Sequence, residues 1–161
     1  MTDWLTPSQQ RLWLAYMGVY HRLEYEMNHQ LQAECDLSLG DFTVLTALSN
    51  ATGQRMQLTS LATLIGWERS RLSHQLLRMT KRGLVDRVQS DSDRRGTDAV
   101  LTTTGRKVLK AAAPRHVAWV RQLFFSDLST VQERELADIL TSVYESILRK
   151  GTLPAPIESS G

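Results

Sequence analysis

Residues 59–83 of this chain read TSLATLIGWERSRLSHQLLRMTKRG. Apolar residues recur at the spacing of a helix on both sides of Gly66. Thr59 is a suitable N-cap for the first helix, and glycine suits the position just after a helix end, where Gly66 and Gly83 stand. Two short helices joined by a tight glycine turn predict a helix-turn-helix.

The following residues, 84–101, read LVDRVQSDSDRRGTDAVL. They predict two short strands, 84–88 and 98–101, joined by a polar loop that is rich in arginine and in turn-forming residues. A β-hairpin that directly follows a helix-turn-helix is a wing. The sequence therefore predicts a winged helix-turn-helix domain.

The second helix, about residues 68–81, has one side that suits a DNA groove. With Leu72 at the centre of its buried side, the period of 3.6 residues turns a polar and basic set outward. That set is Ser70, Arg71, His74, Arg78 and Lys81, and Leu77 points partly outward beside it. Arginine reads the O6 and N7 atoms of guanine in a major groove, and small polar side chains allow close approach.

The tip of the predicted wing carries Arg94 and Arg95. The negative potential of a narrow minor groove attracts arginine, so we expect these side chains to enter one. We expect Asp91 or Asp93 to hold one of them by a bidentate ion pair. Ordinary turn chemistry is the other interpretation of the two aspartates, and both can be true.

Positive charge is concentrated in this part of the chain. Residues 67–96 contain eight basic and four acidic residues, a net charge of +4, whereas the whole chain carries +2 and the remainder therefore −2. A solvated basic helix face is the alternative interpretation, because such faces are common. The glycine turn before the helix and the arginine-tipped hairpin after it favour DNA binding.

Long amphipathic helices are predicted on both sides of this domain. Residues 8–34 carry an apolar stripe at steps of three or four residues, made of Leu12, Tyr16, Val19, Leu23, Met27 and Leu31. Ser38 and Asp41 form a pair similar to a capping box at the start of a second helix. Residues 56–58 suit one short strand of a small sheet.

Two further helices are predicted after the wing. Thr102 is placed to cap a helix that reaches about residue 125, in which Pro114 is expected to cause a kink or an interruption. Ser129 begins a capping box for the last helix, whose apolar stripe consists of Leu136, Ile139, Leu140, Val143 and Ile147.

The predicted fold is therefore mainly α-helical with a small β-hairpin wing. The expected units are an N-terminal dimerisation helix (1–37), the winged helix-turn-helix domain (38–101), C-terminal dimerisation helices (102–150) and a disordered tail (151–161). One domain core cannot easily use apolar stripes from both ends of the chain. A second copy would bury them, so we expect a homodimer.

Length and composition exclude several classes of protein. The 161 residues suit one domain with extensions, and no stretch holds the roughly 20 apolar residues of a membrane span. The first residues lack the basic and apolar regions of a signal peptide. The single cysteine, Cys35, excludes an intramolecular disulfide framework. We therefore expect a cytoplasmic protein with no membrane partner.

These motifs resemble the MarR (multiple antibiotic resistance regulator) family of bacterial winged helix-turn-helix transcription regulators. The resemblance lies in residues 61–66, 69–76 and 81–85. It continues from Asp93 to Gly105, which is similar to the family's D-x-R…L-T-x-x-G signature. It covers about residues 10–148, nearly the whole chain.

The resemblance implies a homodimeric regulator that usually represses transcription. It implies binding to double-stranded DNA at a palindromic operator, and release when a small-molecule effector or an oxidant acts. The second helix would enter the major groove and the wing a minor groove, with no cofactor. Carried over by position, the DNA-binding residues are Arg69, Ser70, Arg71, Ser73, His74, Arg78, Arg94 and Arg95.

Three positions depart from the family's pattern. Glu68 replaces the usual serine at the helix start, where glutamate caps poorly although its charge suits a helix N-terminus. His74 stands where arginine is common, which leaves the operator sequence open and would make binding sensitive to pH. Ala99 replaces valine or isoleucine in the second wing strand and is expected to weaken its packing slightly.

Redox, metal and enzymatic functions are the alternatives. An oxidant sensor needs a thiolate, which two adjacent acids and a helix C-terminus disfavour at Cys35. His21 and His29 lie two helical turns apart, so a metal-responsive regulator would need His116 or carboxylates from another helix. The chain lacks a phosphate loop, a nucleophile elbow and an obvious acid–base pair, so no enzyme is predicted.

An effector pocket is a further candidate, lined by Trp13, Tyr16 and His21 of the first helix. Packing in the core or in a dimer interface is the favoured interpretation of these residues, since aromatic side chains dominate such contacts. The rival from another class is a small ligand- or protein-binding module that does not touch DNA. It would show no salt-dependent DNA binding.

Overall fold

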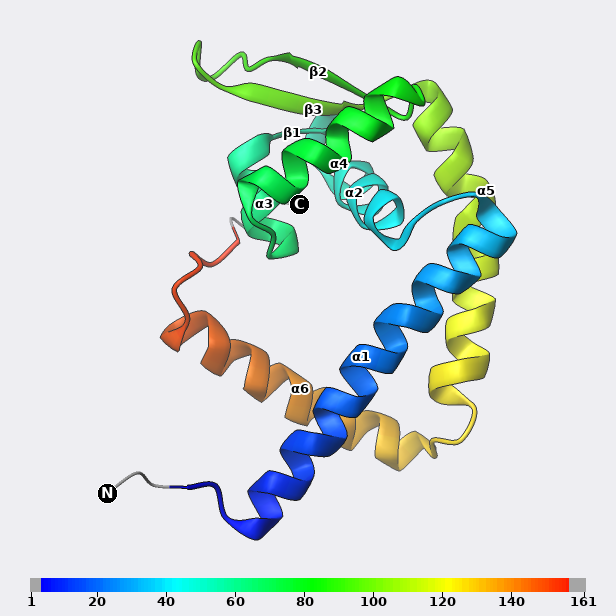
Figure 1. The fold of residues 1–161 in the computed structure, drawn as a ribbon, viewed down its shortest axis with the longest axis vertical. Helices are drawn as coiled ribbons and strands as arrows, with labels where there is room; N and C mark the ends of the chain where they lie inside the picture. The colour runs from blue at the N-terminus through cyan, green and yellow to red at the C-terminus, as the bar shows by residue number, and fades with distance from the viewer. Residues whose placement is uncertain (1–3, 157–161) are drawn as a thin grey trace.

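The computed structural model describes residues 4–156 and shows an open, mainly helical fold (Figure 1). In chain order the elements are α1 (Pro7–Cys35), α2 (Leu39–Asn50), the 3₁₀ turn η1 (Thr52–Gln54), β1 (Arg55–Gln57), α3 (Leu58–Ile65), α4 (Arg69–Lys81), β2 (Val85–Gln89), β3 (Thr97–Leu101), α5 (Thr103–Val120), the π-helical turn η2 (Arg121–Phe125) and α6 (Thr130–Lys150).

The predicted fold class, helical with a small wing, is confirmed. Residues 151–156 belong to no helix or strand, and the rest of the predicted disordered tail, 157–161, lies outside the described residues. Over residues 4–156, every helix is too short or too polar to cross a membrane.

The sheet has three antiparallel strands in the order β1-β3-β2. The hairpin β2–β3 is the predicted wing, and its strands lie within one residue of the expected bounds. Ala99 occupies the middle of β3, where it pairs with Met56 on one side and Arg87 on the other and is fully buried. A small side chain therefore stands at the centre of the sheet.

The core of the winged domain lies between this sheet and helices α2, α3 and α4. Its fully buried side chains include Val44, Leu45, Leu48, Leu61, Leu72, Leu76, Met79 and Val85. Leu31 of α1 and Leu109 of α5 belong to the same cluster. Burial in this core fixes one part of α1 and one part of α5 to the winged domain. Each Å² of apolar surface removed from water stabilises the fold by roughly 25 cal/mol.

Most helix starts follow the local signals in the sequence. Ser38 and Asp41 form a reciprocal capping box for α2, and Ser129 forms one for α6. The hydroxyl of Thr102 accepts a hydrogen bond from the amide of Gly105 and so caps α5. The prediction of Thr59 as an N-cap is wrong: α3 begins at Leu58, with Gln57 as its N-cap, because Gln57 is still paired with Asp98 in the sheet.

Pro114 does not interrupt α5, which continues to Val120. The turns around the proline are held by burial, since Leu109, Ala112 and His116 are all buried. The irregularity lies further on, where residues 121–125 form the π-helical turn η2. Of the expected kink or interruption, the interruption is therefore wrong, because packing of the helix on its neighbours outweighs the one hydrogen bond that proline removes.

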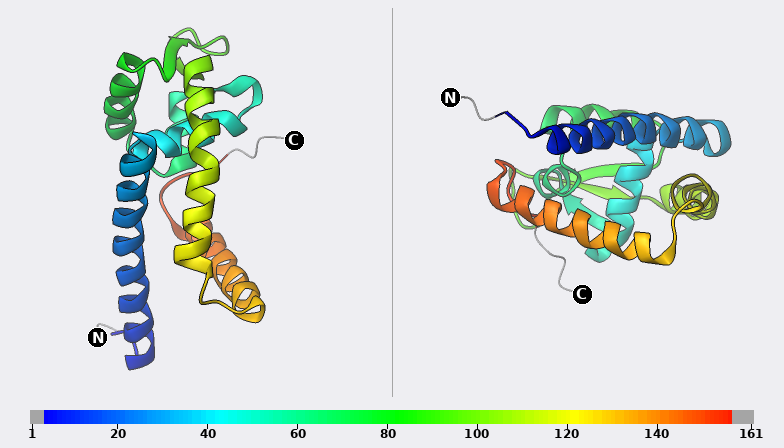
Figure 2. Two further views of the ribbon diagram at one scale, coloured as in Figure 1. Left: turned by 90° about the vertical axis from the view of Figure 1, so that its right-hand side faces the viewer. Right: turned by 90° about the horizontal axis from the view of Figure 1, so that it is seen from below.

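The apolar stripes of α1 and α6 are largely exposed in the single chain. In the N-terminal half of α1, the exposed fractions of Leu12 and Val19 are 71% and 52%. No residue of α6 is buried, and Ile139 and Ile147 are each 59% exposed. Figure 2 shows α1 and α6 on opposite sides of the molecule, so that their crossing in Figure 1 is not a contact. The stripe of α6 and the N-terminal half of the α1 stripe thus lack a partner within the protomer.

His116 of α5 is buried where α1, α2 and α5 meet. Its Nδ1 lies 2.8 Å from Oε1 of Gln30, whose Nε2 donates to Glu34. An amide oxygen only accepts, so the imidazole donates from Nδ1. Phe42 and Trp119 lie against the ring, with centroids 4.7 and 5.7 Å away. Burial lowers the pKa of His116 below its ordinary value.

The buried His116 is expected to make the protein less stable in acid. Because its pKa is lowered in the folded state, the unfolded chain takes up the proton first, and the free energy of unfolding falls as the pH drops below about 6.5. One such group gives a slope of at most about 1.4 kcal/mol for each pH unit. Urea unfolding from pH 7.5 to 5 measures it. His116→Gln should reduce this slope, whereas His74→Gln, which replaces an exposed histidine, should keep it. If His116→Gln unfolds with the wild-type slope, the acid sensitivity does not come from His116.

Candidate nucleic-acid interface

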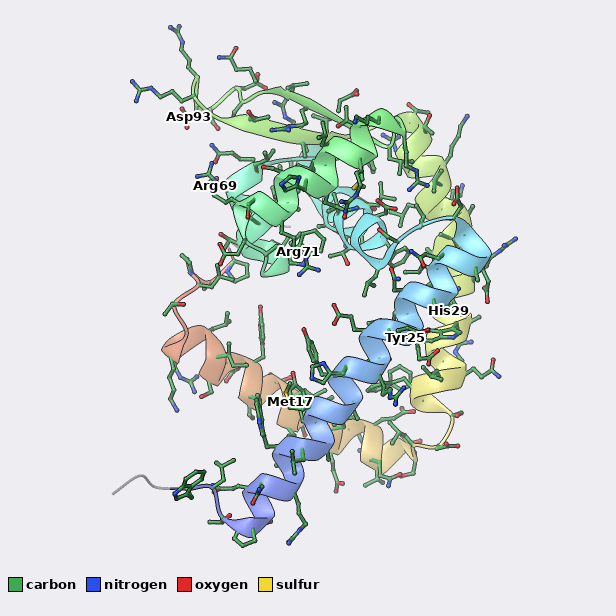
Figure 3. The ribbon with its side chains drawn as sticks, in the orientation of Figure 1. Met17, Tyr25, His29, Arg69, Arg71 and Asp93 are labelled. Atoms are coloured by element: carbon green, nitrogen blue, oxygen red, sulfur yellow. The ribbon has the colours of Figure 1, made fainter. Side chains whose placement is uncertain are left out.

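The exposed side of α4 brings most of the predicted DNA-binding residues together. Leu72, Gln75, Leu76 and Met79 are buried, and the opposite side exposes Arg69, Ser70, Arg71, His74, Leu77, Arg78 and Lys81. Ser73 is only half-buried and stands at the edge of this face. Figure 3 shows Arg69 and Arg71 at the N-terminal end of this helix. We call this surface the α4 face.

The start of α4 is set by the turn before it. Gly66 ends α3 with φ of 70°, a left-handed conformation that favours glycine. Glu68 is the N-cap of α4 and its side chain makes no capping hydrogen bond, as the sequence predicted. The guanidinium of Arg71 lies over the ring of Trp67, 4.1 Å from the centroid. This cation–π contact restrains Arg71 and leaves the edges of its guanidinium free to donate.

The last turns of α4 are tied to the start of α2. Arg78 donates to Oε1 of the buried Gln75, and Gln75 in turn donates to the buried Asp41. Arg82, just after the helix, forms an ion pair with Asp41, with 2.8 Å between Nη1 and Oδ2. The sequence analysis did not assign Gln75 or Arg82 to the site. A buried polar residue on the apolar side of α4 was the available signal for Gln75.

The wing tip is a tight polar turn. The amide of Gly96 donates to the carbonyl of Asp93, and Asp93 also accepts from the amide of Arg95. The side chain of Gln89 donates to the carbonyl of Arg94. These bonds use only backbone groups of the two arginines, so both guanidinium groups are exposed beside the tip that Asp93 marks in Figure 3.

The expected ion pair between an aspartate and a wing arginine is wrong. Asp91 instead pairs with Arg55 of β1, with 2.9 Å between Nη1 and Oδ2. Arg55 also donates twice to Asp98 of β3, which raises the pKa of the guanidinium. Asp93 serves the turn, as the alternative interpretation held. Arg55 lies beside Asp98 because β1 and β3 are paired neighbours, and it also meets Asp91 in the loop that joins β2 to β3; spacing along the chain reveals neither contact.

The candidate effector residues lie on the unpartnered half of α1. Trp13 and Tyr16 are 54% and 48% exposed, and their ring centroids are 5.7 Å apart. His21 is exposed and its ring contacts Tyr20 rather than either of them. The protomer therefore brings Trp13 and Tyr16 together on one surface without enclosing a pocket around the three residues.

The metal and redox alternatives gain no support from the geometry. Among residues 4–156, no three side chains of histidine, cysteine, aspartate or glutamate gather in a way that would hold a metal ion. Cys35 is half-buried at the end of α1. Burial raises the pKa of its thiol and Glu34 raises it further, against a lowering by Arg115. The reactive thiolate is thus disfavoured.

A family model and two solved structures point to the same family. A family model described as the MarR family matches residues 37–97. A MarR family transcriptional regulator from Streptomyces coelicolor, solved in complex with DNA, is 35% identical over 96% of this chain and 98% of its own, with a TM-score of 0.87. The MarR family regulator AbsC, from the same organism, is 37% identical over 92% of this chain and 100% of its own, with a TM-score of 0.84.

A third solved structure shows a more distant likeness. The transcriptional regulator BldR from Sulfolobus solfataricus is 26% identical over 89% of this chain and 100% of its own, with a TM-score of 0.76. A search of curated proteins gave no match. The chain thus spans nearly the full length of the solved regulators that it resembles.

Proposed function

The chain belongs to the MarR family of transcription regulators, and we propose that it works as a homodimeric repressor that binds a palindromic operator and releases it when a small effector binds. The observation that carries the proposal is the α4 face, a row of exposed basic and small polar side chains beside an arginine-tipped wing. The relative solved with DNA supports it, since it shares 35% of its residues with this chain.

The α4 face has the chemistry of a major-groove reader. Arg69 and Arg71 stand at the N-terminal end of the helix, which is the end that contacts base edges in a helix-turn-helix. Ser70 and His74 lie between the cations and allow the helix to approach closely. Arg94 and Arg95 extend from the wing toward the flanking minor groove. In this arrangement phosphate contacts supply most of the affinity, and base contacts set the register.

The exposed stripes of α1 and α6 support the homodimer. Each stripe continues for several turns without a partner in the protomer, and large exposed apolar surfaces mark interaction sites. A second copy related by a two-fold axis would cover both and would place two α4 faces on one side. Two identical readers related by a two-fold axis require an operator with the same symmetry.

The effector part of the proposal places an aromatic or apolar ligand near Trp13 and Tyr16. These two rings are half exposed and close together, so a flat ligand would stack on them once a second copy closes the surface. Such a ligand would act by favouring a dimer in which the two α4 faces no longer match the spacing of the half-sites.

Arg71→Ala is the variant that tests the DNA-binding proposal. Binding sites are first selected from genomic DNA, and the affinity of the protein for the selected operator is then compared with that for a random duplex. We expect the loss of Arg71 to weaken operator binding by roughly 1–3 kcal/mol, and binding to random DNA by much less, because a base contact is lost. Titration at several salt concentrations gives the number of phosphate contacts from the slope of log affinity against log salt concentration.

The control is Arg134→Ala on α6, which removes the same charge far from the α4 face. It should leave both affinities nearly unchanged. An equal loss on operator and random DNA would remove Arg71 from the set of base readers. If the wild-type protein selects no site and shows no salt-dependent binding, the chain is a binding module that does not touch DNA. Transcription that rises rather than falls when protein is added would refute the repressor role.

A further inference from the structure

Asp41, at the start of α2, is a buried carboxylate with three hydrogen-bond donors. Its residue surface is only 4% exposed. Its Oδ1 accepts from Nε2 of Gln75 at 2.7 Å, and its Oδ2 accepts from Nη1 of Arg82 at 2.8 Å and from the amide of Ser38 at 2.9 Å. A buried charge requires such partners, since an unpaired one is strongly disfavoured. The capping of α2 accounts for only one of the three.

Gln75 extends this contact to the α4 face. It is 5% exposed, and its Oε1 accepts from Nη2 of Arg78 at 2.6 Å. Gly40 makes the approach possible, because a Cβ at that position would stand 2.8 Å from the same Oε1. The start of α2 therefore lies close against Gln75, and a Cβ at position 40 would force the end of that side chain to shift.

The second cation, Arg82, connects α4 to the end of α1. Its Nη2 donates to the carbonyl of Asp36 at 2.5 Å and lies 3.6 Å from the Asp36 carboxylate. Asp36 is the C-cap of α1, in a left-handed conformation. One carboxylate, Asp41, thus restrains Arg78 through Gln75 and Arg82 directly.

We propose that Asp41 and Gln75 are positioning residues for DNA binding: together they hold the guanidinium group of Arg78 in place before DNA arrives. This inference rests on the proposed DNA-binding function. A free arginine side chain must be ordered when it binds, and ordering it beforehand removes that cost. The single bond from Arg78 to Gln75 leaves its other donors available, because a guanidinium has five. Neither Asp41 nor Gln75 is exposed enough to contact DNA.

The test is a double-mutant cycle on operator affinity. Gln75→Met keeps the size of the buried side chain but breaks the link between Asp41 and Arg78. We expect about a tenfold loss of operator affinity in the wild-type background and less than about twofold in an Arg78→Ala background, since the cycle isolates the pairwise coupling. Urea unfolding of the same four proteins reports stability separately. A purely structural role would lower stability alike in both backgrounds and show no coupling in DNA affinity.

A matched control and a second variant keep the result clear. Thr46→Val changes a half-buried polar residue of α2, one whose buried hydroxyl makes no hydrogen bond among the described residues, and should leave operator affinity unchanged. Asp41→Asn removes the charge but keeps the shape, and should lower operator affinity with Arg78 and Arg82 both present. If Gln75→Met lowers operator affinity by the same factor with and without Arg78, or does not lower it at all, the positioning role is overturned and the proposed function stands. A wild-type protein that binds no DNA would overturn the proposed function as well.

Discussion

Two carboxylates placed in the apolar stripe of α6, Ile139→Glu with Val143→Glu, are expected to lower operator affinity by about 100-fold or more. Both positions lie on the stripe that has no partner in the protomer, and they are 59% and 50% exposed. In a homodimer they would be buried, and burying an unpaired charge is strongly unfavourable. The variant should therefore be a folded monomer.

The loss of operator affinity follows from the loss of the second α4 face, because a monomer carries only one. A dimer that holds both half-sites binds the second as an intramolecular event, and linked binding of this kind typically gains a factor of about 10² to 10⁴. A monomer with an intact α4 face would keep the affinity of one half-site. Analytical ultracentrifugation gives the mass in solution, and titration of the selected operator gives the affinity.

The control adds the same charge to the other side of the helix. Thr141→Glu with Ser142→Glu places two carboxylates on the polar face of α6, where both residues are exposed. This variant should remain a dimer and bind the operator almost as well as the wild type, with a small loss from repulsion between acid and phosphate. A dimer that survives the Ile139 and Val143 substitutions would refute the role of the α6 stripe.

Gly105→Ala is expected to destabilise the protein by about 3 kcal/mol, at the upper end of what overpacking usually costs. A Cβ on Gly105 would stand 2.1 Å from the carbonyl oxygen of Leu84 and 3.0 Å from a methyl group of Leu101. The same carbonyl accepts a hydrogen bond from the hydroxyl of Thr102. The start of α5 is thus pressed against the backbone that precedes the wing.

This contact gives a physical reason for the glycine in the L-T-x-x-G segment. Thr102 caps α5 and bonds back to Leu84, and Gly105 is the residue that lets the first turn lie close enough for that bond. The backbone oxygen cannot move aside as a flexible side chain would, so the strain falls on the wing. Urea unfolding of the variant measures the loss, and weaker operator binding should accompany it.

Gly18→Ala serves as the control for a glycine within a helix. Apart from its chain neighbours and the backbone of its own helix, no heavy atom lies within 4 Å of the position where its Cβ would stand, so the substitution adds no clash. Alanine is better than glycine in a helix interior by about 1 kcal/mol, and the variant should be slightly more stable than the wild type. If Gly105→Ala also proved stabilising, the close approach to Leu84 would not be what requires glycine.

Local signals predicted the elements well because they act between near neighbours. The capping boxes at Ser38 and Ser129 join residues three apart, and both are present in the structure. The period of hydrophobic residues placed the buried side of α4 on Leu72, Leu76 and Met79, all of which are buried. Thr59 was misjudged because strand pairing between Gln57 and Asp98, which are distant in sequence, decides where β1 ends.

The partners of the charged groups were not predictable in the same way. Helical spacing shows which face of α4 a residue occupies, but not which residue of another element approaches it. Arg55 forms ion pairs with Asp91 and Asp98, and Asp41 forms an ion pair with Arg82 and a hydrogen bond with Gln75. The partners are distant in the sequence, and the packing of the whole core brings them together. The cation–π contact between Arg71 and Trp67 also depends on the turn before α4.

The sequence alone determined the winged helix-turn-helix, the polar side of its second helix and the apolar stripes at both ends of the chain, since periodicity and capping depend on residues within a few positions of one another. Only the tertiary structure shows what supports the exposed arginines: the buried Asp41 and Gln75 lie behind Arg78, and the half-buried Trp67 lies beneath Arg71. The contact between Asp41 and Gln75 exists only after the core has brought α2 and α4 together, because the hydrophobic effect that packs the core is non-directional and leaves the pairing of polar groups to the final geometry.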